Sequence, residues 1–581
     1  MADAAVPHRA PDPDPAARRA CDAWLDDFFA HYYRCRPVNA TFVGVHEHDH
    51  ALPDFSPEGS ARTAAEMRDL RARLASIPTA GLPEARRHDL LLADGFLEIQ
   101  LWEDAAPHFH RGNPALYTGE AVFSVLGLFL RDTEPLAERA EAAIARMNAL
   151  PGFLAQARAN LREAPVAWTE QAIREARSGV TYFRDGLRIL AAERGIDAPG
   201  FLAAAEIARA AFAEHAARLE QDLLPRSSDA YACGREAFDR YLARGHCLTS
   251  GHDAAWVEAY AQAALERHRA TLVERAREID PSRTPEELLA GLADRHPTVE
   301  GYYRAYAEVW EAARQAALDH DLLSWPDHPI AYVPIPPSDR EAAAGLYYLP
   351  YRCPPPFGRH EVHRYLVPPV EPGIPPAEQE RRLRAANDSV IALNHVVHHG
   401  GLGHHVQNWH AFRADSRIGR IAGVDSASRL ALFCAGTLVE GWACYATDLM
   451  DEIGFLTPLQ SLAEQQSRVR MAGRAVVDVA LHTGALTLDQ AAAFYEREIG
   501  MPPAASHAEA VKNSMFPGAA MMYLIGTDAI HDLRRTNADR DGAAFSLRAF
   551  HDRFLSYGAI PVPLIAASML ARETPVGTAM A

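Results

Sequence analysis

Residues 394–405 read Asn-His-Val-Val-His-His-Gly-Gly-Leu-Gly-His-His, which places five histidines within eleven consecutive positions. Another histidine, His410, follows shortly afterwards. Neutral imidazole is the most common nitrogen ligand for zinc and similar metals, and ordinary core packing does not explain such a density of histidines. The segment therefore predicts a metal site. The alternative is a string of solvent-facing or capping histidines.

Helix geometry limits which of these histidines can share one ion. In a regular helix, His398 and His404 lie about 120° apart around the axis, while His398 and His405 align but are separated by about 10.5 Å along it. Zinc–nitrogen bonds measure roughly 2.0–2.1 Å, so neither pair can bind one ion unless the helix is interrupted. The three glycines among residues 400–403 permit tight or left-handed backbone at that place.

A second pairing is open. His395 and His399 have i,i+4 spacing and lie on one face of an undistorted helix. This pairing makes no use of the glycines, so it is the alternative to the interrupted helix.

The remainder of the chain has mostly helical patterning. The 581 residues are 48% apolar, enough for a large buried core. Residues 130–325 are rich in Ala, Arg, Glu and Leu with apolar positions spaced by three and four, which predicts long amphipathic helices. Loops between them are predicted at Pro151-Gly152, Pro199-Gly200, residues 226–229 and Pro281.

Proline-rich sequence separates two helical parts. We expect a disordered leader at residues 1–20, an N-terminal helical part at 21–325, a proline-rich β segment at 326–372 and a metal-site helical part at 373–581. These parts are expected to form one continuous structural unit. The β segment either lines a substrate groove or serves as a rigid connector.

The net charge and the cysteines limit which partners and which compartment are expected. The formal charge of −18 argues against nucleic acid and membrane surfaces, which leaves a small-molecule or peptide substrate. The N-terminal residues contain no apolar run typical of a signal peptide, so we expect a cytoplasmic protein. The seven cysteines include no Cys-x-x-Cys pair, which favours free thiols. The oligomeric state is left open.

Several blocks of the sequence resemble one family. Residues 398–407 (His-His-Gly-Gly-Leu-Gly-His-His-Val-Gln) and 440–445 (Glu-Gly-Trp-Ala-Cys-Tyr) resemble the segments His-Glu-x-x-Pro-Gly-His-His-Leu-Gln and Glu-Gly-Trp-Ala-x-Tyr of a bacterial zincin-like family known as domain of unknown function 885. Residues 470–482, 517–526 and 550–563 resemble its later blocks. The resemblance spans nearly the whole chain.

This resemblance implies a mainly α, zincin-like fold of gluzincin type, with a small β region before the metal-binding helix. It also implies that His398, one of His404 and His405, and Glu440 bind the metal, with zinc as the expected ion and iron as the alternative. His404 is slightly favoured over His405 because it directly follows a glycine.

The chain departs from the family at a catalytic position. The family has a glutamate after its first histidine, where a zincin needs a general base, and this chain has His399. We expect His399 to act as the base, or to bind metal or substrate instead. Tyr523 is a candidate oxyanion donor, Arg474 a candidate partner of a substrate carboxylate or oxyanion, and His482 a residue that orients a ligand histidine. The structural alternatives are a core tyrosine and an ion-pair network joining two helices.

Three functions remain open. The first is a metal-dependent hydrolase with an altered base that acts on an amide, a peptide or a small specialised metabolite. The second is a non-hydrolytic metal enzyme, because two histidines and a carboxylate also form the facial triad of non-haem iron oxygenases. The third is an inactive, metal-stabilised binding protein.

Overall fold

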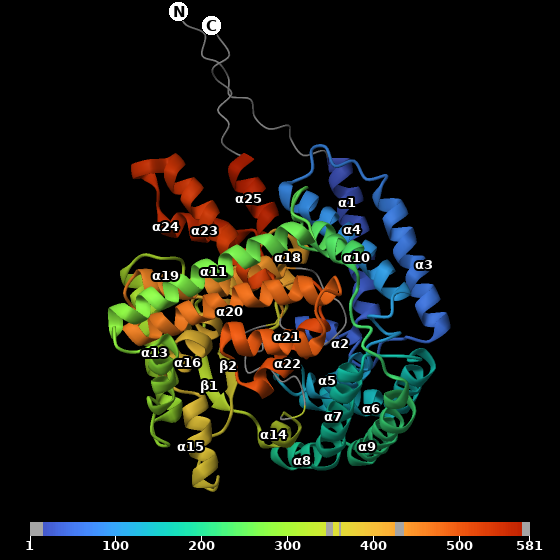
Figure 1. The fold of residues 1–581 in the computed structure, drawn as a ribbon. Helices are drawn as coiled ribbons and strands as arrows, with labels where there is room; N and C mark the ends of the chain where they lie inside the picture. Colours follow the sequence, from blue (N-terminus) through green and yellow to red (C-terminus); the bar gives the residue numbers. More distant parts are fainter. Residues whose placement is uncertain (1–14, 344, 346–352, 359–361, 425–434, 572–581) are drawn as a thin grey trace, which may run out of the picture.

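The first helix begins before residue 21, the predicted start of the N-terminal helical part. The computed structural model describes residues 15–343, 345, 353–358, 362–424 and 435–571 (Figure 1). Helix α1 (Pro15–Cys35) begins inside the predicted leader. Ala17, Cys21 and Trp24 on this helix are buried, so packing of one face stabilises its first turns. The prediction of disorder is therefore wrong for residues 15–20, and residues 1–14 lie outside the described part.

The N-terminal part forms two groups of helices, α1–α4 and, below them in Figure 1, α5–α9. After α1 the elements are α2 (Pro37–Val43), α3 (Pro57–Leu74), α4 (Glu84–Ala105), α5 (Pro114–Leu126), α6 (Leu136–Asn160), α7 (Val166–Thr181), η1 (Tyr182–Gly186), α8 (Leu187–Arg194) and α9 (Phe201–Arg218). Helix α9 packs on both α6 and α7. These amphipathic helices thus bury their apolar faces against one another.

One predicted loop is wrong. Pro151-Gly152 lies inside α6, with both residues exposed to solvent. A proline in a helix interior costs about 3 kcal/mol. Met147, Leu150 and Phe153 of the same helix are buried, and their packing outweighs this cost. The other predicted breaks between helices are confirmed at Pro199-Gly200, residues 226–229 and Pro281.

A two-stranded parallel sheet confirms the small β region. The elements leading to it are η2 (Leu219–Leu223), η3 (Leu224–Arg226), α10 (Arg235–Arg240), η4 (Tyr241–Gly245), α11 (Ala254–Ile279), α12 (Pro285–Ala290), η5 (Gly291–Asp294) and α13 (Tyr302–Asp319). Strand β1 (Ile330–Pro334) pairs with β2 (His363–Val367) in a register that places Ile330 beside His363, and α14 (Pro337–Ala343) lies between them in sequence. Residues 344, 346–352 and 359–361 of this segment lie outside the described part.

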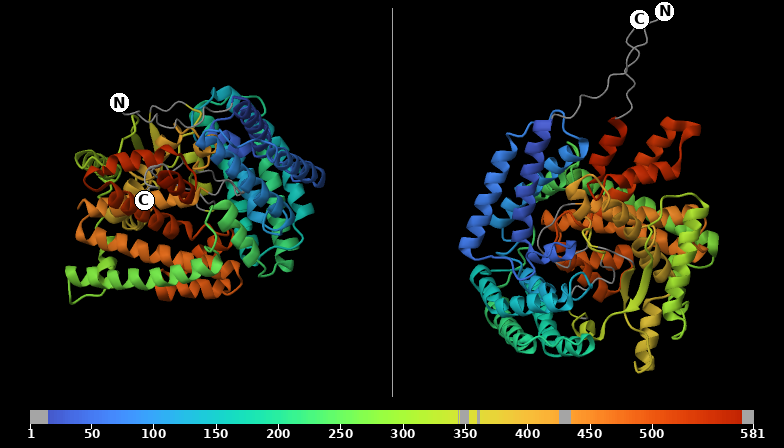
Figure 2. Two further views of the ribbon diagram at one scale, coloured as in Figure 1. Left: turned by 90° about the horizontal axis from the view of Figure 1, so that it is seen from above. Right: turned by 180° about the vertical axis from the view of Figure 1, so that it is seen from behind.

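The C-terminal part is helical and carries the histidine segment. Its elements are α15 (Pro376–Ala385), α16 (Asp388–Val390), η6 (Ile391–Gly400), α17 (His404–Ala411), α18 (Arg417–Ile421), α19 (Gly436–Glu452), α20 (Pro458–His482), α21 (Leu488–Phe494), η7 (Tyr495–Ile499), α22 (Pro503–Ser514), α23 (Met522–Asp541), η8 (Gly542–Ala544), α24 (Leu547–Ser556) and α25 (Val562–Ala571). Helices α11 and α20 run side by side although they are far apart in sequence (Figure 2).

Helices α19 and α23 cross at two glycines, and this crossing fixes the helix that carries Glu440. A Cβ atom on Gly441 would lie 2.6 Å from the carbonyl carbon of Gly526, so side chains larger than hydrogen would separate the helices. The buried apolar residues form one continuous cluster from Ala17 to Met569. The chain therefore has a mainly α fold with a shared core. Within the described residues, none of the helices has the length and apolar character needed to cross a membrane.

Candidate metal centre

The histidine segment is interrupted at its glycines, as its geometry requires. Element η6 is a π-helix that ends at Gly400, and α17 begins at His404. Three hydrogen bonds hold the turn between them: the Gly403 N–H donates to the Val397 carbonyl (2.9 Å), the Trp310 indole to the Gly400 carbonyl (2.7 Å) and the Trp442 indole to the Leu402 carbonyl (2.8 Å). The two indole donors come from α13 and α19, so helices outside the segment hold this turn in place.

The glycines permit close approach here. A Cβ atom on Gly403 would lie 1.8 Å from the His398 carbonyl oxygen, and one on Gly400 would lie 2.1 Å from the Tyr332 hydroxyl. The left-handed backbone that the sequence allows does not form, since Gly401 has a φ of −119° and Gly403 a φ of −70°. Close contact, with the backbone at Gly403 and with the Tyr332 side chain at Gly400, requires glycine at these positions, and handedness does not.

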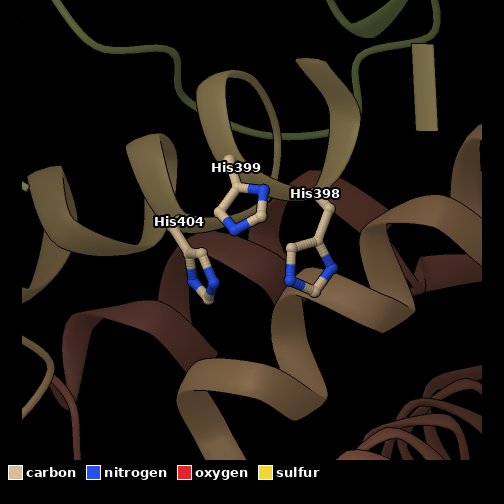
Figure 3. Close-up of side chains that lie close together, drawn as sticks. All are labelled: His398, His399 and His404. Atoms are coloured by element: carbon tan, nitrogen blue, oxygen red, sulfur yellow. The ribbon is translucent and has the colours of Figure 1, made fainter. Parts of the chain in front are cut away.

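Three histidines and one carboxylate converge at this turn. The rings of His398, His399 and His404 lie together in Figure 3, with centroids 4.6–5.3 Å apart. One nitrogen from each ring lies within 4.8 Å of the others. Glu440 comes from α19, and its Oε2 is 3.4 Å from His398 Nε2 and 3.7 Å from His404 Nε2. Three elements, η6, α17 and α19, thus supply the four side chains.

Neighbouring groups orient the rings. The Nδ1 atom of His399 lies 2.7 Å from the Asn394 carbonyl, which accepts a hydrogen, so this nitrogen carries the proton and Nε2 keeps its lone pair. The Nδ1 atom of His398 lies 3.9 Å from the Cys444 thiol, one helical turn after Glu440. The contact with the Asn394 carbonyl leaves the Nε2 atom of His399 to act as an acceptor or ligand.

Burial sets the charges of the cluster. Burial lowers the pKa of His404 to about 4 and holds that of His399 well below its ordinary value. Burial acts to raise the pKa of Glu440, but its interactions with His398 and His404 outweigh this effect, and the pKa lies below its usual range. The neutral imidazoles of His399 and His404 beside the ionised carboxylate of Glu440 offer nitrogen and oxygen donors that suit zinc.

Comparison with known proteins identifies the family. The profile of a family described as "Bacterial protein of unknown function (DUF885)" matches residues 37–569. The chain belongs to this family. Membership of the DUF885 family, inferred from the sequence blocks, is thereby confirmed, whereas the zincin-like character and the metal chemistry of the site stay predictions.

Two solved structures resemble this DUF885 chain over nearly its full length. One is a "putative lipoprotein of unknown function" from Shewanella oneidensis, 21% identical with a TM-score of 0.75. The other is a "putative lipoprotein" from Colwellia psychrerythraea, 16% identical with a TM-score of 0.76. Each comparison covers 96% of this chain and 100% of the other. At these identities the likeness shows the fold alone. No curated protein sequence matches the chain.

The remaining histidines of the segment face other partners. His405 Nε2 donates to the His328 carbonyl at 3.2 Å, so His404 joins the cluster and His405 turns away from it. His395 Nδ1 hydrogen-bonds with the Tyr365 hydroxyl of β2 at 2.8 Å. The alternative pair of His395 with His399 is therefore not brought together as a site, and the small sheet instead supports the back of η6.

The predicted catalytic residues of α20 and α23 form a separate set of contacts. Arg474 donates to Glu509 of α22 at 2.6 Å and lies over the Tyr523 ring at 4.9 Å, so its charge is already paired. Asp478 accepts hydrogen bonds from the backbone N–H groups of the loop before α23. Burial raises the pKa of Asp478 to about 7. These contacts favour the structural alternative for Arg474.

His482 is fully buried at the end of α20. Its Nε2 lies 3.0 Å from the Asn513 carbonyl, and its ring stacks on Phe238. Among the described residues, the partners of His482 include no member of the histidine cluster. These contacts do not join His482 to a ligand histidine that it could orient, and helix packing accounts for the position of His482.

A pocket of about 1800 Å³ opens beside α20. Walls from α11, α12, η7 and α22 surround it, and Arg470 and Glu509 are among its lining residues. The described lining residues do not include the histidine cluster. The pocket therefore adjoins the Arg474–Glu509 ion pair, and the histidine cluster is not part of its described wall.

Sequence reasoning missed two residues at the cluster. Cys444 is one of the seven cysteines predicted only as free thiols, although its i,i+4 spacing from Glu440 places it on the same helix face. Tyr365 lies within the predicted β segment, and no local pattern indicates that its hydroxyl reaches His395. The spacing is a usable signal for Cys444, whereas the contact of Tyr365 depends on the sheet.

Proposed function

We propose that this protein is a metal-dependent hydrolase of gluzincin type that holds zinc with His398, His404 and Glu440. The observation that carries the proposal is the convergence of two imidazoles and a carboxylate with nitrogen–oxygen separations of 3.4 and 3.7 Å. In a tetrahedral zinc site, nitrogen and oxygen ligands lie roughly 3.4 Å apart. The donor atoms therefore need little movement to bind an ion.

Each side chain has a distinct task in this proposal. Zinc held by three protein ligands supplies a Lewis acid that activates water and polarises a carbonyl oxygen. His399 takes the proton at Nε2, because its Nδ1 already donates to the Asn394 carbonyl. The reaction class is hydrolysis of an amide, a peptide or a small specialised metabolite.

The first test is elemental analysis of the purified protein beside two variants. We expect Glu440→Ala to contain about one zinc fewer per chain than wild type, because only two ligands remain at this centre. His405→Gln is the matched control: it changes the neighbouring histidine, whose Nε2 faces the His328 carbonyl, and should keep the metal. Equal zinc contents in Glu440→Ala and wild type would contradict the ligand assignment.

Other outcomes select another class of protein. Iron in place of zinc would favour the oxygenase hypothesis. His399 lies within ligand distance of His398 and His404, so a loss of metal in His399→Ala would make it a ligand. Such a closed site leaves no open position and would favour a metal-stabilised binding protein.

The compartment is tested separately. The cytoplasmic location stays a prediction, and the description of the two solved relatives as lipoproteins makes an envelope location the competing proposal. Fractionation of source cells, followed by detection of the full-length chain, distinguishes the two.

A further inference from the structure

A second group of metal-ligating side chains lies between α1 and α3, outside the histidine cluster. His31 and Cys35 occupy i,i+4 positions at the end of α1, and Glu66 faces them from α3. His31 Nδ1 lies 2.9 Å from Glu66 Oε2 and 3.8 Å from Cys35 Sγ. One ligand atom from each of the three residues lies within 4.8 Å of the others.

These separations resemble those of a bound ion. Zinc bonds of roughly 2.0–2.2 Å to nitrogen or oxygen and 2.3 Å to sulfur imply about 3.4–3.6 Å between ligand atoms in a tetrahedral site. The observed distances of 2.9 and 3.8 Å lie on either side of this range. The third pair, Glu66 with Cys35, lies within 4.8 Å, so side-chain movements of at most about 1 Å would bring the three atoms to these separations.

The packing around the group holds it in place. The Trp24 indole donates to the Leu70 carbonyl at 3.0 Å, and Arg73 pairs with Asp27 at 2.7 Å, so α1 and α3 are fixed to each other on the same side. The His31 side chain is 5% exposed and that of Glu66 is 36% exposed. His31 is therefore held in the interior between the two helices, whereas the exposed part of Glu66 gives an ion a route of entry from solvent.

The thiol has polar neighbours on two sides. His31 Nδ1 and Nε2 lie 3.8 and 3.9 Å from Cys35 Sγ. The Thr63 hydroxyl lies 3.7 Å from Cys35 Sγ, close enough to offer a further oxygen to an ion bound there. A thiolate is the form of cysteine that binds metals.

We propose that His31, Cys35 and Glu66 bind a second metal ion that clasps α1 to α3, independently of the proposed hydrolase centre. A mixed donor set of thiolate sulfur, imidazole nitrogen and carboxylate oxygen suits zinc better than calcium or magnesium, which take oxygen ligands. Three protein ligands leave one position for Thr63 or for water. The role is structural, because the ion joins two helices of the N-terminal part.

Arg34 is the competitor for this site. Its guanidinium pairs with Glu66 and is 52% exposed on the surface. A bound cation would share the carboxylate with Arg34 or displace its side chain toward solvent. Replacing Arg34 should therefore strengthen metal binding, a result that an ordinary surface ion pair does not predict.

The test uses cobalt in the full-length Glu440→Ala chain, which lacks a ligand of the first centre. Cobalt(II) bound to a thiolate gives a sulfur-to-metal charge-transfer absorption, which imidazole and carboxylate ligands do not give. We expect about one cobalt per chain with this absorption, and loss of both in Cys35→Ser. Cys444→Ser is the matched control, because Cys444 is the thiol next to His398 and should not affect the signal.

Two further variants keep the proposal testable if Cys35→Ser fails to fold. Glu66→Gln changes a partly exposed side chain and should weaken cobalt binding about 10-fold or more, whereas Arg34→Gln should tighten it several-fold. No thiolate absorption in the Glu440→Ala chain would overturn the proposal, as would an absorption lost in Cys444→Ser instead. If the hydrolase proposal alone fails, the wild-type chain still binds one ion that depends on Cys35.

Discussion

His399 is the residue on which the chemistry of the centre depends. The family pattern has glutamate there, and this chain places an imidazole whose Nδ1 is bound to the Asn394 carbonyl. The His399 ring lies beside those of His398 and His404 in Figure 3, so it can accept a proton or bind the ion. Loss of a well-placed general base typically lowers the rate by roughly 100- to 10,000-fold.

Removing this base should therefore lower the rate. We expect His399→Gln to keep the metal and to lower kcat/KM for simple peptides about 100-fold or more, because the amide cannot accept the proton. His399→Glu is the control, since it has the length of glutamine and its carboxylate replaces the imidazole as proton acceptor, so it should keep hydrolysis. Peptide cleavage with zinc content measured in parallel checks both variants. Equal rates in the two variants would contradict the role of the base.

The turn between η6 and α17 brings the ligands together as one element. Its close contacts leave no room for a methyl group at Gly403, where a Cβ atom would lie 1.8 Å from the His398 carbonyl oxygen. Any side chain there must push His398 away from His404. The position of these two ligands is thus set by a backbone contact.

Gly403→Ala should lower zinc affinity 10-fold or more and destabilise the fold by about 2–4 kcal/mol. Gly152→Ala in α6 is the matched control, because nothing lies within 4 Å of the added Cβ atom. It should keep the metal and raise the free energy of unfolding by up to about 1 kcal/mol. Metal titration and urea unfolding measure both effects. Unchanged affinity in Gly403→Ala would show that the turn tolerates a side chain.

The loop before α23 is held by one buried carboxyl group. Asp478 of α20 accepts hydrogen bonds from the N–H groups of Gly518 (3.1 Å), Ala520 (2.8 Å) and Met521 (2.9 Å). Burial raises its pKa from 3.8 to about 7, so the folded chain binds this proton more tightly than the unfolded chain does. The stabilisation from this proton is fully present below about pH 3.8 and is lost as the pH rises through about 7.

Asp478→Asn should remove this dependence. We expect the difference in unfolding free energy between wild type and variant to shrink by roughly 1–3 kcal/mol as the pH rises from about 4 to 7. Urea unfolding followed by circular dichroism at several pH values measures it. A difference that grows with pH would mean that the three N–H donors stabilise the carboxylate more than burial opposes it.

The whole molecule shares one core, although the proline-rich segment divides its sequence. Buried apolar residues connect from Ala17 to Met569, and Asp89 of α4 accepts from Ser416 (2.6 Å) beside α18. The parts before residue 325 and after residue 373 therefore stabilise each other. We infer that neither keeps its structure when the other unfolds.

Unfolding of the full chain should accordingly be a single transition. We expect far-ultraviolet circular dichroism and tryptophan fluorescence to report the same midpoint, because Trp24 and Trp442 are buried in the same core. Zinc at about 100 times its Kd should raise the stability of that one transition by about 2.7 kcal/mol. Two separate midpoints would show that the helical parts unfold independently.

Local patterns predicted much of the centre. The spacing of His398 and His404 required an interrupted helix, and the glycines between them marked where it occurs. Periodicity predicted the mainly α fold, and proline density located the two strands. Each of these features depends on residues within a few positions of one another, so a sequence displays them directly.

Tertiary packing decided the rest. Local spacing does not distinguish His404 from His405, so packing decides which of them joins the cluster. Packing also brings together residues that are distant in sequence, as in the contacts of Tyr365 with His395 and of Glu66 with the end of α1. The same holds for the helical path across Pro151, where the buried face of α6 outweighs a local breaker. The sequence determined which side chains are available for metal chemistry; the tertiary structure determined which of them meet, because the direction of a ring and the partner it faces depend on the whole core.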